Sequence, residues 1–117
     1  VVGGRSAGAR SAARSALALE ARGAVALAFP LHPPGRPERS RADELRACGV
    51  PLLVVQGERD SMGRPEEFPE PPSTGLDLAV VPHADHSLRV PARAPISHGQ
   101  ALGLVVDAVA NWLAKLA

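Results

Sequence analysis

The stretch VVGGRSAGAR, residues 1–10, places Ser6 between two glycines where a short β-branched run meets a helix-forming run. Two interpretations of this G-x-S-x-G pattern compete. In the first, Ser6 is a nucleophile in a strained turn between strand and helix. Gly4 and Gly8 are then required, because side chains there would collide as the helix packs back on the strand. In the second, Ser6 lies in an ordinary Gly-Ser turn that caps the helix, or in a loose terminus.

Beyond this turn, helix-type and strand-type segments alternate. A helix is predicted from Ala7 to about Arg22, because this segment is rich in Ala and Leu, lacks Pro and stops at Gly23. Short apolar runs bounded by Gly or Pro are typical of strands buried on both faces. Such runs occur at 24–29, 52–56 and 76–81, a short charged helix is expected at 39–48, and an amphipathic helix capped by Ser97 is expected at 98–115.

This alternation predicts an α/β fold, with a parallel sheet of about four strands and helices on both faces. The first strand is the one that ends at Gly3, and the whole of 1–117 is expected to form a single domain. Ligands of such sheets bind at the C-terminal ends of the strands. We therefore expect the chemistry in Ser6 and in the loops that follow the later strands.

The composition argues against several classes of partner. A net charge of +1 gives no basis for binding nucleic acid or an anionic membrane, and no apolar run approaches the ~20 residues of a membrane span. Cys48 is the only cysteine, so no intramolecular disulfide can form, which favours a reducing, cytoplasmic location. The Cys48 thiol is interpreted as a small buried hydrophobe.

Two later loops carry side chains that could activate Ser6. Asp60 follows the predicted strand at 52–56, where a carboxylate can orient a histidine, although a surface turn is the alternative and Glu58 is a nearby competitor. His86 follows the last predicted strand and could act as general base for Ser6, whereas a solvated loop histidine is the alternative. The sequence therefore predicts a Ser6, Asp60 and His86 triad.

Further site residues are expected around this triad. The Ala7 N–H lies at the predicted helix N-terminus, where the helix dipole favours an oxyanion. Arg5 and His32 are the candidate substrate-binding residues, but the PLHPPG segment around His32 fits a rigid polyproline connector equally well. His83 and His86 have a metal-ligand spacing without a further ligand cluster, so neither a metal nor another cofactor is expected.

The segments GGRSAGAR, FPLHPPGRPE, PLLVVQGERDSMGRPEE and PHADHSL, with the C-terminal helix, resemble the small dienelactone-hydrolase-like α/β-hydrolases. This group includes the hydrolase-like domains of testis-expressed and NSL-complex proteins. The PLHPPG loop is the most discriminating segment, and the order Ser6, Asp60, His86 is the one expected for α/β-hydrolases. The resemblance implies an esterase that acts on a small-molecule acyl substrate, with Ser6 as nucleophile, Asp60 as acid, His86 as base and the Ala7 N–H as one oxyanion donor.

The same resemblance implies that part of the fold is missing. A complete α/β-hydrolase has about four more strands before the serine turn, and a loop after the third supplies the second oxyanion N–H. The chain is therefore interpreted as the C-terminal half, with its strands in chain order, and weak or no activity is expected of it alone. The open edge at Val1–Gly3 is a candidate for self-association. A non-catalytic scaffold on the same fold is the alternative function.

Overall fold

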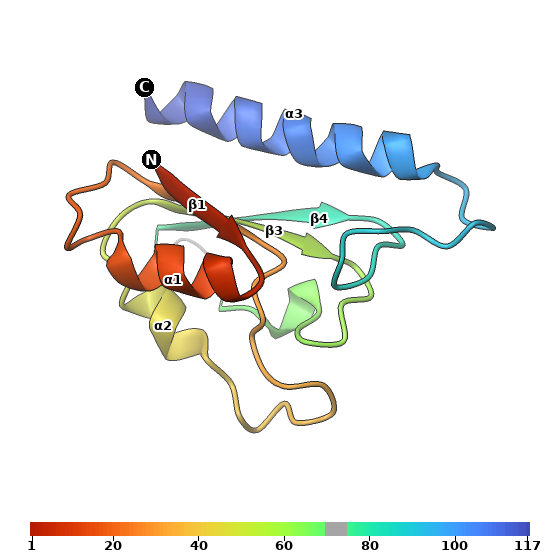
Figure 1. The fold of residues 1–117 in the computed structure, drawn as a ribbon, viewed down its shortest axis with the longest axis horizontal. Coiled ribbons are helices and arrows are strands. Elements are labelled where there is room, and N and C mark those ends of the chain that lie inside the picture. The colour runs from red at the N-terminus through yellow and green to blue at the C-terminus, as the bar shows by residue number, and fades with distance from the viewer. Residues whose placement is uncertain (70–74) are drawn as a thin grey trace.

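The computed structural model describes residues 1–69 and 75–117 (Figure 1). Its strands pair in parallel in the sheet order β1-β2-β3-β4. This confirms the predicted α/β fold and the chain order of the strands. The strands are β1 (Val2–Arg5), β2 (Ala24–Leu27), β3 (Leu52–Gly57) and β4 (Leu76–Val81).

Helices cover both faces of this sheet (Figure 1). On one face lie α1 (Ala7–Ser15) and α2 (Ala42–Arg46), and the long helix α3 (His98–Leu116) crosses the other face. A single 3-10 turn, η1 (Pro65–Glu67), lies in the connection between β3 and β4. None of the helices in the described segments combines the length and the apolar character needed to cross a membrane.

The sheet separates two apolar cores, because side chains of a strand alternate between its two faces. The core under α1 and α2 contains Phe29 and Leu45, which are 0% and 1% exposed. The core under α3 contains Val55 and Trp112. Every residue of β3 is buried, which explains why its sequence is apolar up to the single amide of Gln56.

The first helix is shorter than the sequence predicts. Its regular part is followed by turns, and Glu20, with φ of 55°, takes the left-handed position expected for Gly23. The Ala21 N–H then donates to the Ala16 C=O at 2.9 Å, a bond typical of helix C-termini. Gly23 is required for a different reason, because a Cβ there would lie 2.7 Å from the Trp112 ring.

The third helix begins where the sequence predicts. The Gln100 N–H donates to Ser97 Oγ at 3.0 Å, and the Ser97 N–H donates to Gln100 Oε1 at 2.7 Å. This capping box confirms Ser97 as the N-cap. The cap fixes the point at which the chain leaves the loop after β4 and turns onto the sheet.

Strained backbone is concentrated at the C-terminal edge of the sheet. Among the non-glycine residues with positive φ are Ser6 (54°), Ala28 (53°), His83 (64°) and Leu88 (60°), which follow the ends of β1, β2 and β4. Each such residue costs on the order of 1–3 kcal/mol, and they tend to cluster at functional sites. This edge is therefore the place to look for a site.

Candidate active site

Ser6 forms the tight turn between β1 and α1. Its backbone has φ 54° and ψ −116°, a combination that non-glycine residues rarely adopt. The Ser6 N–H donates to the Leu27 C=O at 2.9 Å and so fixes the turn against β2. Ser6 occupies the N-cap position of α1, but its side chain makes no capping hydrogen bond. Its Oγ instead lies 2.9 Å from His86 Nε2, so the interpretation of Ser6 as a helix-capping side chain is wrong.

The glycines on either side of Ser6 are not equivalent. A Cβ at Gly4 would overlap the backbone of Gly8, so the close crossing of β1 and α1 requires glycine at this position. A Cβ at Gly8 would meet no described heavy atom within 4 Å. The prediction that packing requires both glycines is therefore confirmed for Gly4 and wrong for Gly8.

His86 connects Ser6 to Asp60. Its Nδ1 lies 2.8 Å from Asp60 Oδ2 and 3.0 Å from Asp60 Oδ1. When Nδ1 carries the proton and donates it to this carboxylate, Nε2 is left as an acceptor for the Ser6 hydroxyl. The three side chains come from the C-terminal ends of β1, β3 and β4 and form one hydrogen-bonded series.

The Asp60 carboxylate is fixed by more than the imidazole. Its side chain is 0% exposed. The Met62 N–H donates to Oδ1 at 2.8 Å, and Gln56 Nε2 donates to Oδ2 at 3.0 Å. A buried carboxylate needs such donors, because burial without them would be strongly unfavourable. Each carboxylate oxygen of Asp60 therefore has a hydrogen-bond donor in addition to His86.

Gln56 is a positioning residue that the sequence analysis missed. It is 0% exposed, and its Nε2 lies 3.0 Å from the Phe29 C=O and 2.9 Å from the Gly63 C=O. Its Oε1 accepts a hydrogen bond from the Phe29 N–H at 2.9 Å. Gln56 thereby joins the end of β2 to the loop that carries Asp60. The available signal was a single amide at the end of an otherwise apolar strand.

The loop that carries His86 packs tightly on the end of β3. Asp85 Oδ1 accepts a hydrogen bond from the Ser87 N–H at 2.8 Å, which shapes the turn around His86. A Cβ at Gly57 would lie 2.6 Å from the Ala84 carbonyl oxygen, so glycine permits this close approach. These contacts fix the backbone on either side of the imidazole.

Glu58, the competitor of Asp60, and His83, the histidine considered with His86 as a metal ligand, contact each other instead. The His83 N–H donates to Glu58 Oε1 at 2.8 Å, and no hydrogen bond joins either residue to the Ser6, His86 and Asp60 series. Within residues 1–69 and 75–117, no group of three or more His, Cys, Asp and Glu side chains is arranged to hold a metal ion.

His32 lines a cavity that Asp60 also lines, and both nitrogens of its ring are hydrogen-bonded to other residues of the protein. The ring is buried, with Nδ1 2.7 Å from the Pro33 C=O and Nε2 2.9 Å from Glu67 Oε1. The Pro33 carbonyl raises the pKa of His32, burial opposes this, and Glu67 adds to the increase. The His32 N–H also donates to the Met62 C=O at 3.0 Å. His32 thus lines a cavity of about 410 Å³ beside Asp60, with both ring nitrogens occupied.

Arg5 and Ala7 flank Ser6. Ala7 is the first residue of α1, so its N–H belongs to the first-turn donors that have no acceptor within a helix. Its role as an oxyanion donor stays a prediction. Arg5 lines a hollow of about 240 Å³ near the C-terminal ends of β1 and β2.

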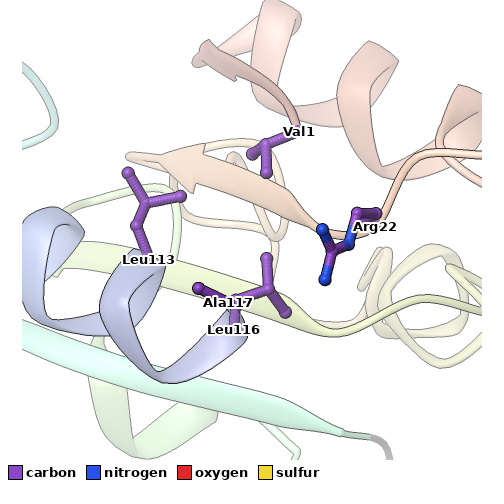
Figure 2. A pocket seen from close by; sticks show the side chains of 5 residues that line it. All are labelled: Val1, Arg22, Leu113, Leu116 and Ala117. Atoms are coloured by element: carbon purple, nitrogen blue, oxygen red, sulfur yellow. The ribbon is translucent and has the colours of Figure 1, made fainter.

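A separate pocket, shown in Figure 2, lies at the N-terminal ends of the strands, between Val1, Arg22 and the end of α3.

Comparison with known proteins shows the family to which the chain belongs. The sequence matches the α/β hydrolase domain family over residues 1–114, and the chain therefore belongs to that family. The resemblance to α/β-hydrolases is confirmed at this level, and the dienelactone-hydrolase-like subgroup stays a prediction. The search of curated proteins found no match.

Two solved structures have a similar fold. One is an α/β serine hydrolase homologue from Coxiella burnetii, with a TM-score of 0.61, 22% identity, and coverage of 93% of this chain and 47% of that chain. The other is the esterase domain of a Rhodothermus marinus protein, with a TM-score of 0.56, 18% identity, and coverage of 92% and 57%. The chain spans about half the length of these structures.

Proposed function

We propose that the protein is a serine hydrolase that cleaves carboxylic esters or related acyl compounds. The observation that carries this proposal is the series in which Ser6 Oγ lies 2.9 Å from His86 Nε2 and His86 Nδ1 lies 2.8 Å from Asp60. This is the arrangement of nucleophile, base and orienting carboxylate that acyl transfer requires. Membership of the α/β hydrolase family supports the same reaction class.

In the proposed reaction, His86 Nε2 takes the hydroxyl proton as Ser6 Oγ attacks the acyl carbon. The electron pair of the carbonyl moves to oxygen and gives a tetrahedral oxyanion. When this oxyanion collapses, the alcohol leaves with the proton from His86, and Ser6 carries the acyl group. Water then attacks by the same route, releases the carboxylic acid and restores Ser6. Asp60 stays ionised and holds the imidazole in its orientation.

The Ala7 N–H is the proposed oxyanion donor within this chain. It lies at the N-terminus of α1, where backbone donors and the helix dipole favour negative charge. Loss of one such donor typically lowers turnover by ~10²–10³.

We place the reaction in the cytoplasm, because the single cysteine, Cys48, is buried and cannot form an intramolecular disulfide.

A fluorophosphonate probe tests the proposal, because it labels only an activated serine. We expect labelling of the wild type and none of Ser6→Ala. Ser11→Ala is the matched control, since Ser11 is an exposed serine of the same helix and should leave labelling unchanged. Circular dichroism of each variant verifies folding. A folded full-length protein that takes no label would contradict the hydrolase and leave the non-catalytic scaffold as the better function.

A further inference from the structure

The hollow of about 240 Å³ beside the Ser6 turn has an apolar floor and a basic rim. We call it the basic hollow. Leu27, Leu88 and Val105 contribute to the floor, and Leu102 of α3 extends it. Arg5, Arg89 and His98 supply the rim, and none of the lining residues in the described chain is acidic. The site therefore combines surface for a short hydrocarbon chain with positive charge.

The basic hollow adjoins the reactive groups along the chain. Arg5 directly precedes Ser6, and Ser87, which also lines the hollow, directly follows His86. An acyl group attached to Ser6 would therefore have the hollow as its neighbour on the side of the sheet covered by α3. The cavity beside His32 lies instead behind the buried Asp60 carboxylate.

The charges around the rim are available to a ligand. Neither Arg5 nor Arg89 takes part in the ion pairs formed among the described residues. One oxygen of the nearby Asp85 carboxylate, Oδ1, accepts the backbone N–H groups of Ser87 and Arg89 at 2.8 Å and 3.1 Å, and no ion pair joins this carboxylate to Arg5 or Arg89 among the described residues. His98 begins α3, so the positive end of the helix dipole also faces this region.

Resting on the proposed hydrolase function, we propose that the basic hollow selects acyl substrates that carry a carboxylate. The apolar floor would hold the methylene chain, and Arg5 and Arg89 would bind the carboxylate at its far end. Monoesters of short dicarboxylic acids are the substrate class with this chemistry. Because both guanidinium groups are exposed, the discrimination against a neutral analogue is about fivefold and weakens with salt.

Kinetics with two matched esters test the selection. The substrates are mono-4-nitrophenyl glutarate and its neutral methyl ester. We expect wild-type kcat/KM to favour the free acid by about fivefold at low ionic strength. The double variant Arg5→Gln, Arg89→Gln should bring this ratio close to one. Arg22→Gln, an exposed arginine at the distant pocket of Figure 2, should leave the ratio unchanged.

A binding measurement separates this inference from the proposed function. Full-length Ser6→Ala, which cannot form an acyl-enzyme, is titrated with glutaric acid monoamide and with the neutral diamide, and NMR shifts report both affinities. Tighter binding of the monoamide, lost on adding Arg5→Gln and Arg89→Gln, supports the basic hollow even if no ester is hydrolysed. Equal affinities, or a preference that survives both substitutions, would overturn it, whether or not the wild type hydrolyses esters.

Discussion

Gln56 is the residue on which the buried part of the site depends, although it contacts neither Ser6 nor His86. Its amide satisfies the Phe29 N–H and donates to the Gly63 C=O and the Asp60 carboxylate, all within a fully buried region. A buried polar group that loses its partner costs about 1–3 kcal/mol. Replacement of Gln56 by an apolar residue of similar size would leave several such groups unpaired at once.

We therefore predict that Gln56→Leu lowers the free energy of unfolding by about 3 kcal/mol. Gln100→Leu is the matched control, because Gln100 is exposed and contributes only to the cap of α3, so its loss should cost about 1 kcal/mol or less. Urea unfolding followed by circular dichroism measures both. Equal losses in the two variants would contradict the role given to Gln56.

His32 and Glu67 form a partly buried pair whose contribution depends on pH. His32 has a pKa above its ordinary 6.5, caused first by the Pro33 carbonyl and then by Glu67 against the opposing effect of burial. Burial acts to raise the pKa of Glu67, but the Arg64 N–H and His32 outweigh it, and the pKa falls below its ordinary 4.5. The two shifts act in opposite directions, so the pair has an optimum pH range.

The directions of the two pKa shifts define a pH window in which this pair stabilises the fold. The His32 contribution is complete below pH 6.5 and is lost as pH rises through the raised pKa. The Glu67 contribution is complete above pH 4.5 and is lost as pH falls through the lowered pKa. We predict that the stability difference between wild type and Glu67→Gln, about 1 kcal/mol, is largest between these values. Denaturation at pH 3.5, 5.5 and 8.5 measures it, and a difference independent of pH would contradict the prediction.

At the scale of elements, the crossing of β1 and α1 sets the position of Ser6. Gly4→Ala would place a methyl group into the Gly8 backbone, whereas Gly8→Ala adds a methyl group in open space and improves helix propensity. We predict that Gly4→Ala destabilises the protein by about 3 kcal/mol and reduces labelling of Ser6. Gly8→Ala should be neutral or slightly stabilising. Thermal unfolding and probe labelling of both variants check this, and similar behaviour of the two would count against it.

The elements were predictable where local pattern and tertiary packing agree. The apolar runs of β2, β3 and β4 lie between cores on both faces, so burial alone identifies them. The end of α1 was not predictable, because Ala and Leu continue after Ser15 without a local breaker. The chain leaves the helix there and Leu17 and Leu19 are 60% and 63% exposed. The end of the helix is therefore set by the connection to β2 and not by the helix propensity of these residues.

The candidate site was predictable to the extent that it follows from strand direction. Parallel strands all point the same way, so Ser6, Asp60 and His86, each placed after a strand, meet at one edge. Their catalytic roles stay predictions. Gln56 was missed because a strand pattern does not reveal which buried backbone groups an amide will satisfy. The helix α2 is limited to Ala42–Arg46 and is shorter than predicted, because the charged residues before it and Ala47 and Cys48 after it include no local breaker until Gly49.

At the scale of the whole molecule, β1 and β4 are the two edge strands of the sheet in the described chain. In the described chain, β1 pairs only with β2. Beside it, Leu102, Val106 and Leu113 of α3 are 54%, 58% and 39% exposed and lie on the same side of the helix. An open strand edge next to an apolar strip favours association. A two-fold axis normal to the sheet would pair two β1 strands and place both α3 helices on one face.

We predict concentration-dependent self-association through this edge and the apolar strip of α3. Val106→Glu should shift the equilibrium toward monomer by about tenfold, because a charge would be buried in the contact. Leu104→Glu is the matched control, since Leu104 is also exposed on α3, at 42%, but points away from this strip. Analytical ultracentrifugation over a range of concentrations measures both. A wild type that stays monomeric, or equal effects of the two variants, would refute the prediction.

The left-handed backbone of Ser6 has a consequence for protein engineering. At φ 54° and ψ −116° any Cβ is strained, so removal of the hydroxyl alone leaves the strain in place. Ser6→Gly should therefore be more stable than Ser6→Ala by about 1 kcal/mol, the reverse of the usual ranking of these residues inside regular structure. Calorimetric melting of the two variants compares them directly. Selection for thermal stability alone would thus drive this chain to discard the proposed nucleophile.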